Sequence, residues 1–202
     1  MITFYRMHSN SPNMRKVGIM LAETGLAYTN KYVEKGGNGT CAEEFRAISP
    51  NCTAPAIVDD ETGAVVFESA AVLCYLADKT GKLLPASPRK RADVLKWLVF
   101  EAANIGPVMV ELHHHVLTGA DDGAGSELER QRGRLVRSCG ILEQQLAGRE
   151  YLAGDYSIAD IALYPWSVVL EDMAEIRLGD YPNLSNWASR ISARPAVQLS
   201  AK

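Results

Sequence analysis

The sequence predicts an α/β domain followed by an all-helical domain. Residues 1–81 alternate strand signals with helix signals, whereas the chain after residue 91 has the apolar periodicity of helices alone. Residues 82–91 carry two prolines and four basic residues, a composition typical of a linker. We therefore expect an α/β domain over 1–81, a linker over 82–91 and a helical domain over 92–202.

The first domain is predicted to have the element order βαβαββα. Its strands are expected at Ile2–Tyr5, Tyr28–Val33, Pro55–Val58 and Ala64–Phe67. Its helices are expected to begin at Ser11-Pro12, to lie within Cys41–Ile48 and to span Ser69–Thr80. Helical crossovers favour parallel strands, and the short turn at 59–63 favours an antiparallel hairpin, so the sheet is expected to be mixed.

The helical domain is predicted from helix-start signals and from the spacing of apolar residues. Ser-Pro at 87–88 combines an N-cap with proline, and Gly-Pro at 106–107 is expected to kink the helix that follows. Two capping boxes, Ser126 with Glu129 and Ser157 with Asp160, are expected to open two later helices.

Composition excludes several classes of protein. The 202 residues include 21 Lys and Arg against 24 Asp and Glu, and the net charge of −3 disfavours a broad nucleic-acid-binding face. The start of the chain lacks the layout of a signal peptide, and the longest uncharged stretch, 47–58, is too short to span a bilayer. We expect a cytoplasmic protein with reduced thiols that binds neither nucleic acid nor a membrane.

The cysteines and histidines do not have the spacing of a metal site. The four cysteines (Cys41, Cys52, Cys74 and Cys139) contain no C-x-x-C pair, which excludes a zinc ribbon, a thioredoxin-type dithiol and a dense disulfide framework. Adjacent residues on a helix diverge by about 100°, so the run His113–His115 is not expected to converge on a metal. Cys52 is the one cysteine that we expect to be sensitive to redox conditions.

Three short segments carry residues suited to an anionic or peptide-like ligand. Ser11 and Asn13 lie at a helix N-terminus, where a thiolate gains hydrogen bonds and its pKa falls. The Ala54-Pro55 pair enters a strand, and the Glu68-Ser69 pair joins a strand to a helix. Taken singly, each segment fits ordinary helix capping or a strand start, and the sequence alone favours a trans bond before Pro55.

The joint order of these segments resembles the cytosolic glutathione transferases. The motifs that carry the resemblance are Ile48–Val58, Phe67-Glu68-Ser69, Tyr75-Leu76, Leu84-Pro85, Gly154–Ala162 and Arg194–Val197. The resemblance implies a thioredoxin-like first domain, a cis Pro55 and a homodimer. It also implies that the Ala54 backbone pairs with the cysteinyl unit of glutathione, and that Glu68 and Ser69 bind the γ-glutamyl end.

The start of the first helix is similar to the bacterial Nu-like group of that family, in which disulfide-bond reductase activity is typical. The matching segment is Ser11-Pro12-Asn13-x-x-Lys16-Val17. The similarity implies that Ser11 and Asn13 contact the glutathione sulfur and that Asn38 stands where the group has glutamine. Ser9 is a rival contact, because the loop before Ser11 is longer than in that group.

The resemblance implies an enzyme in which bound glutathione thiolate attacks an electrophilic carbon or a disulfide sulfur. Glutathione is then a cosubstrate, and neither a permanently bound cofactor nor a metal is expected. The residues expected to border the electrophile pocket are Met7, His8, Met109 and His113. Two alternatives are a non-catalytic interaction or regulatory module of the same fold, and a thioredoxin-like oxidoreductase that uses Cys52.

Overall fold

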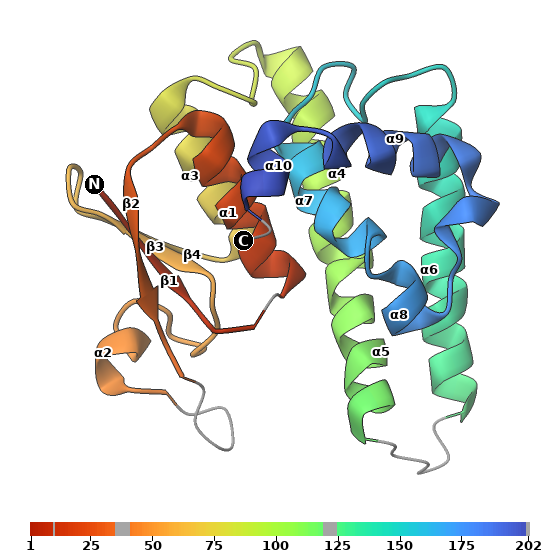
Figure 1. Cartoon of the computed structure of the whole chain (residues 1–202), viewed down its shortest axis with the longest axis horizontal. Helices are drawn as coiled ribbons and strands as arrows, with labels where there is room; N and C mark the ends of the chain where they lie inside the picture. Colours follow the sequence, from red (N-terminus) through yellow and green to blue (C-terminus); the bar gives the residue numbers. More distant parts are fainter. Residues whose placement is uncertain (10, 35–40, 119–124, 201–202) are drawn as a thin grey trace. The chain divides into compact units, whose positions relative to one another are not determined.

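The computed structural model describes residues 1–9, 11–34, 41–118 and 125–200 as two compact units (Figure 1). The first unit is Met1–Leu84 together with the C-terminal segment that begins at Pro195. The second unit is Pro85–Arg194. Among the helices of these described residues, none has both the length and the apolar composition needed to cross a bilayer.

The first unit contains a four-stranded mixed sheet. Its elements are β1 (Ile2–Arg6), α1 (Pro12–Thr24), β2 (Tyr28–Tyr32), α2 (Glu43–Arg46), β3 (Ala56–Asp59), β4 (Ala64–Phe67), α3 (Ser69–Thr80) and α10 (Pro195–Leu199). The strand order is β2-β1-β3-β4, with β1 parallel to β2 and β3 antiparallel to both of its neighbours. The predicted thioredoxin-like α/β fold and its element order are confirmed.

The direction of β3 corrects one expectation. The second crossover was expected to produce a parallel strand, but β3 runs antiparallel to β1, with Ala56 opposite Tyr5. The reason lies in the segment before β3, which holds the chain at the end of β1. The ring of Phe45 in α2 stacks on Tyr5 with 5.8 Å between ring centroids, so the chain re-enters the sheet beside Tyr5 and runs back along β1.

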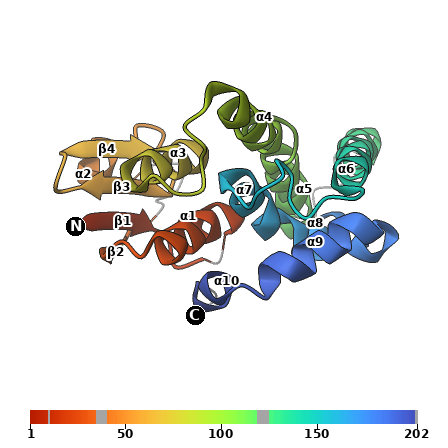
Figure 2. The same cartoon turned by 90° about the horizontal axis from the view of Figure 1, so that it is seen from above.

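Helices cover the sheet on both faces. Tyr5 and Phe45 form a buried cluster with Ala56 on the face that carries α2. Neighbouring residues of a strand point to opposite faces, so Phe4 is directed to the other face, where α1 and α3 lie side by side (Figures 1 and 2). The helices α1 and α3 begin at the end of the sheet where β1 and β4 finish and where β3 starts.

The unit boundaries differ from the predicted ones in two places. The helix α4 begins at Pro88, inside the segment expected to be a linker, and α10 packs with α1 in the first unit. A side chain built on Gly18 of α1 would contact Ser200 at 3.7 Å, which shows how closely the C-terminal segment approaches this helix. Composition cannot reveal this return of the chain, because the two partners lie far apart in the sequence.

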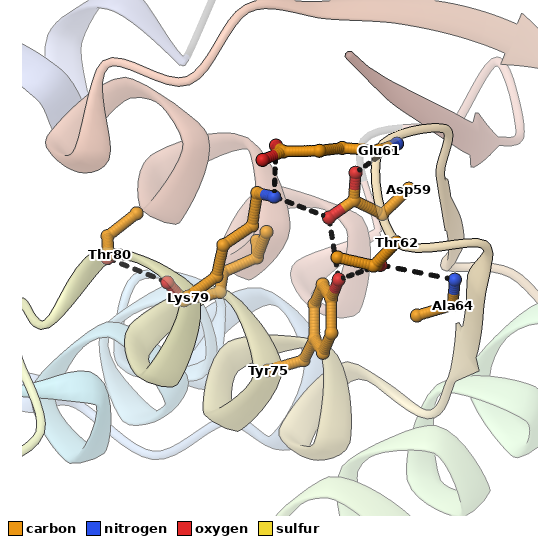
Figure 3. Close-up of polar contacts among 8 residues, drawn as sticks. Asp59, Glu61, Thr62, Ala64, Tyr75, Lys79 and Thr80 are labelled. Atoms are coloured by element: carbon orange, nitrogen blue, oxygen red, sulfur yellow. Dashed lines mark hydrogen bonds and ion pairs between the residues drawn. The ribbon is translucent and has the colours of Figure 1, made fainter.

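A polar cluster around the buried Asp59 joins the β3–β4 hairpin to α3 (Figure 3). The Asp59 carboxylate is fully buried and accepts a hydrogen bond from the Tyr75 hydroxyl at 2.6 Å, while Lys79 Nζ lies 2.8 Å from its Oδ2. Burial favours the protonated carboxyl, but hydrogen bonds from Lys79, Tyr75 and the Glu61 N–H outweigh it and hold the pKa of Asp59 well below its ordinary value. The cluster fixes α3 against the hairpin.

The second unit consists of helices around one fully buried helix. Its elements are α4 (Pro88–Asn104), α5 (Gly106–Thr118), α6 (Gly125–Leu146), α7 (Ile158–Ser167), α8 (Leu170–Ala174), the short 3-10 helix η2 (Leu178–Asp180) and α9 (Pro182–Ser192). Every residue of α7 is buried, as expected of a helix that is apolar on all sides. The kink expected at 106–107 is a break at Ile105, which separates α4 from α5.

The predicted capping box at the start of α7 is present. Asp160 is completely buried, and its carboxylate accepts hydrogen bonds from the Ser157 N–H and hydroxyl, each at 3.0 Å. Its other oxygen accepts the Leu152 N–H at 3.0 Å and Trp187 Nε1 at 2.9 Å. Burial raises the pKa of Asp160, although all four donors favour the ionised form. One side chain therefore joins α7, α9 and the loop before α7.

Replacing Asp160 with alanine is expected to destabilise the protein by about 3 kcal/mol or more, because it leaves several buried donors without an acceptor. Urea unfolding followed by circular dichroism measures this loss. The control is Asp155→Ala, since Asp155 is an exposed carboxylate in the same loop. Equal stabilities for the two variants would contradict the anchoring role of Asp160.

Replacing Asp59 with asparagine is expected to lower the stability of the protein at neutral pH. It is also expected to reduce the loss of stability that acidification causes. A depressed folded-state pKa stabilises the protein above the unfolded value of about 4, and this stabilisation is lost as the pH falls through the folded value. Asp59→Asn removes that contribution, so its stability should fall less on acidification than that of the wild type. Unfolding in urea at a series of acidic pH values tests this, with the exposed neighbour variant Asp60→Asn as control. An unchanged acid dependence in Asp59→Asn would exclude the proposed linkage.

Candidate active site

Asn13 links the start of α1 to the start of α3. Its Oδ1 accepts a hydrogen bond from Lys16 Nζ at 2.7 Å and from Ser69 Oγ at 3.3 Å. Two donors on the oxygen fix the amide orientation and leave Nδ2 as the end that donates to other groups. Lys16 is only 1% exposed, so its positive charge is held inside the unit beside a helix N-terminus. The start of α1 is therefore favourable to an anion.

Ser11 is the N-cap residue of α1, as predicted, but it caps the helix with its backbone alone. Its carbonyl oxygen accepts the N–H groups of Met14 and Arg15, both at 3.0 Å. Its side chain makes no capping hydrogen bond to the described residues of this helix. The hydroxyl is thus not engaged by the helix that Ser11 begins, and it is chemically able to donate to an anion at this point.

Glu68, rather than the predicted Ser69, is the N-cap residue of α3. Its carbonyl oxygen accepts the Val72 N–H at 2.9 Å, whereas the hydroxyl of Ser69 turns to Asn13 instead of capping its own helix. The backbone of Glu68 has φ 68° and ψ 122°, a conformation that is unfavourable for a residue with a side chain. Such conformations concentrate at functional sites. The Glu68 carboxylate is exposed, as the binding of a ligand ammonium group requires.

A tight turn at 49–53 orients a second amide. Asn51 Oδ1 accepts hydrogen bonds from Ser49 Oγ at 3.0 Å and Thr53 Oγ1 at 2.8 Å. Its Nδ2 donates to Glu68 Oε1 at 3.4 Å. The logic is the same as for Asn13, since two donors on the oxygen direct the NH₂ group. This turn therefore positions the carboxylate of Glu68.

The bond between Ala54 and Pro55 is cis. The register of β3 begins with Ala56, which lies opposite Tyr5 and Phe67, so Ala54 precedes the paired part of the strand. Its backbone N–H and carbonyl are not part of the strand ladder and suit pairing with an extended peptide-like ligand. Local sequence could predict neither the cis bond nor the position of the Ala54 backbone outside the strand ladder.

Two cysteines depart from the expected reduced state. Cys41 and Cys52 form a disulfide with a Cα–Cα distance of 5.5 Å. The expectation of reduced thiols is wrong for this pair, because folding the segment around α2 brings together two residues with no recognisable spacing. Cys74 and Cys139 form no disulfide, and burial raises the pKa of Cys139 to about 11.

Sequence reasoning missed the residues that orient the site. Lys16, Ser49, Asn51 and Thr53 were not predicted as site residues, although all four belong to motifs quoted for the family resemblance. Their role is to fix the amides of Asn13 and Asn51, which only coordinates reveal. Asn38 lies outside the described residues.

The four residues expected to line the electrophile pocket are divided between the two units. In the first unit, the Met7 N–H donates to Met14 Sδ at 3.0 Å, and the ring of His8 stacks on Tyr32 with 4.1 Å between centroids. In the second unit, Met109 is buried and His113 is half-buried on α5. The pocket stays a prediction. Within the described ranges, no group of three or more His, Cys, Asp or Glu side chains is placed to hold a metal.

The chain thus combines a thioredoxin-like unit, with a polar site at its helix starts, and a helical unit, which defines a class of two-domain proteins with α/β and all-α parts. Two family models match this chain. The glutathione S-transferase N-terminal domain covers residues 10–79, and the glutathione S-transferase C-terminal domain covers residues 105–195. The chain belongs to the glutathione S-transferase family.

Known proteins of this family resemble the chain over nearly its whole length. It is 38% identical over 193 residues to the disulfide-bond oxidoreductase YfcG of Escherichia coli (strain K12), covering 93% of this chain and 89% of YfcG. It is 34% identical over 203 residues to the disulfide-bond oxidoreductase YghU of the same organism, covering 93% and 70%. A glutathione transferase from Pseudomonas putida, with one glutathione disulfide bound per subunit, has a TM-score of 0.88 at 32% identity, covering 100% of this chain and 90% of that one.

Proposed function

We propose that this protein is a glutathione transferase that binds glutathione as its thiolate and directs it at an electrophilic carbon or a disulfide. The observation that carries the proposal is the pair of hydrogen bonds on Asn13 Oδ1, because they occupy the amide oxygen and leave the Asn13 NH₂ group as a donor in the first turn of the helix that Ser11 caps. The resemblance to YfcG and YghU, both disulfide-bond oxidoreductases, favours a disulfide as substrate.

The groups of the site match the chemistry of the γ-glutamyl and cysteinyl units of glutathione. The carboxylate of Glu68 accepts a hydrogen bond from the α-ammonium of the γ-glutamyl unit. The backbone N–H of Ser69, at the N-terminus of α3, donates to the carboxylate of that unit, because the Ser69 hydroxyl donates to Asn13. The backbone of Ala54, before Pro55, pairs with the cysteinyl unit. Asn38 is assigned to glutathione binding from the family pattern alone.

The thiolate is placed at the start of α1. Hydrogen bonds from Ser11 and Asn13, together with the helix N-terminus and the buried charge of Lys16, stabilise the anion over the thiol. Lowering the thiol pKa by about two units from its ordinary value requires roughly 2.7 kcal/mol. Several charge-assisted hydrogen bonds supply an energy of that size.

The chemistry with a disulfide needs two glutathione molecules and no other cofactor. The bound thiolate attacks one sulfur of the substrate, the S–S bond breaks, and the other sulfur leaves as a thiolate that takes up a proton. A second glutathione thiolate then attacks the glutathione sulfur of the mixed disulfide. The products are glutathione disulfide and two substrate thiols. With an electrophilic carbon, a single attack releases the leaving group and the conjugate.

We also propose a homodimer in the cytoplasm, the compartment whose thiol pool is glutathione. Val65 and Phe67 on β4 are 49% and 39% exposed, and alternate residues of a strand share one face. This small apolar face suits contact with a second copy. Met7, His8, Met109 and His113 remain our candidates for the electrophile pocket.

Two measurements on the wild-type protein test the proposed function. Titrating it with glutathione, at a pH below the ordinary pKa of the free thiol, is expected to produce the ultraviolet absorbance band of the thiolate. A parallel assay of hydroxyethyl disulfide reduction and chlorodinitrobenzene conjugation, both with glutathione, is expected to show faster disulfide reduction. Absence of a thiolate band at saturating glutathione would point to the non-catalytic module instead. Loss of activity in Cys52→Ala with glutathione still bound as thiolate would favour the thioredoxin-like alternative.

Ser11 and Glu68 are expected to affect different quantities. Ser11→Ala should raise the pKa of bound glutathione by about one unit, the cost of one charge-assisted hydrogen bond, with little loss of affinity. Glu68→Gln should weaken glutathione binding about tenfold and leave the bound thiol pKa unchanged at saturation. Thiolate titration and calorimetry separate the two effects.

Matched variants control for indirect effects. Glu43→Gln alters an exposed carboxylate on α2 and should leave glutathione affinity at the wild-type value. Ser9→Ala should leave the thiol pKa unchanged. If Ser9→Ala raises that pKa and Ser11→Ala does not, the thiol contact belongs to Ser9.

A further inference from the structure

The Cys41–Cys52 disulfide lies in the chain segment that also carries Asn51 and Ala54 of the candidate site. Cys52 stands between Asn51 and Thr53, whose side chains are joined by a hydrogen bond of 2.8 Å. Ala54 follows two residues later. Cys41 lies just before α2, so the bond ties the segment in front of this helix to the turn that follows it.

The conformation around Cys52 is one that the chain does not adopt without constraint. Cys52 has φ 56°, in the left-handed region that disfavours residues with a side chain. Its N–H donates to the Ser49 carbonyl at 2.9 Å, which closes the turn. The disulfide adds a covalent constraint to this turn. Breaking it frees the turn that directs Asn51 to Glu68.

The two sulfurs differ in their access to a thiol in solution. Cys52 is 3% exposed, whereas Cys41 is half-buried. An incoming thiolate therefore reaches Sγ of Cys41, and Sγ of Cys52 is the leaving group. The other two cysteines do not offer this chemistry, because neither Cys74 nor Cys139 is part of a disulfide.

We propose that Cys41 and Cys52 form a thiol–disulfide couple that exchanges with glutathione, and that the disulfide form binds glutathione more tightly than the dithiol form. The inference rests on the proposed function, since it takes the site beside Cys52 to be the glutathione site. The thiol that attacks the protein disulfide comes from solution. The quantity that changes with the redox state is the affinity of the site for glutathione.

The exchange balances with two glutathione molecules. The first thiolate attacks Sγ of Cys41, the protein S–S bond breaks, and Cys52 Sγ takes the electron pair and a proton. The second thiolate attacks the glutathione sulfur of the mixed disulfide, and Cys41 leaves as a thiolate that is then protonated. The protein disulfide is reduced to two thiols, and two glutathiones are oxidised to one glutathione disulfide. Glutathione disulfide reverses both steps.

The couple makes glutathione binding depend on the ratio of glutathione to its disulfide. When glutathione disulfide accumulates, the protein is held in the tighter-binding form. Because linkage is reciprocal, a ligand that prefers the disulfide form must also protect the disulfide from reduction by the same factor.

The test uses S-methylglutathione, which occupies the site but has no free thiol to exchange. Calorimetry compares wild-type protein oxidised with glutathione disulfide and wild-type protein reduced with a phosphine. Reduction is expected to weaken binding about five-fold or more. Equal dissociation constants would overturn the inference while leaving the proposed function intact. Failure of both forms to bind would overturn the proposed function and this inference with it.

Two variants assign the effect to the disulfide. Cys41→Ala should bind S-methylglutathione like the reduced wild type and should not respond to the phosphine. Cys74→Ala keeps the pair and should respond as the wild type does. A phosphine response that persists in Cys41→Ala would overturn the assignment.

A second measurement on the wild type does not depend on how well a variant folds. Alkylation and mass spectrometry in mixtures of glutathione and glutathione disulfide should show Cys41 and Cys52 changing state together. At saturation, added S-methylglutathione should raise the ratio of disulfide to dithiol protein by the factor found in calorimetry. A disulfide that stays oxidised at every ratio would show a purely structural bond and overturn the inference.

Discussion

The candidate site depends on the hydrogen bond between Ser69 and Asn13. It joins the first turn of α3 to the first turn of α1, two helices separated in sequence by three strands and a helix. With Lys16 on the same oxygen, it sets which end of the Asn13 amide is left to donate. This contact connects the helix start that carries Ser11 with the helix start that carries Glu68.

The same device recurs in the turn before β3 and in the helical unit. Asn51 receives two hydroxyl donors and is thereby directed at Glu68, and Asp160 receives four donors and holds the start of α7. In each case a polar side chain is satisfied by neighbours that lie close in sequence and by one group that is remote. The local bonds set orientation, and the remote bond joins elements. A site assembled in this way is preorganised, because its donors are directed before any ligand arrives.

The absence of a C-x-x-C pair excludes less thiol chemistry than the sequence suggests, because glutathione and the Cys41–Cys52 disulfide both bring thiol chemistry to this protein. The sequence excludes a dithiol of the thioredoxin type, and the proposed catalytic thiol belongs to the cosubstrate instead. The folded chain nevertheless contains a disulfide, between cysteines too far apart in sequence to form a recognisable motif. Its position beside Asn51 is the basis of the proposed link between the redox state of the protein and the binding of glutathione.

The sequence by itself determined the mixed α/β fold, the helix starts at Ser11 and Ser157, and the order in which the site segments occur, because capping and apolar periodicity are local properties. Glu68-Ser69 and Ala54-Pro55 could be singled out for the same reason, with the help of a family pattern. Only the tertiary structure decided that β3 runs antiparallel to β1, that the C-terminal segment packs on α1, and that Cys41 reaches Cys52. These outcomes depend on contacts between residues remote in the chain, and no local spacing encodes such contacts.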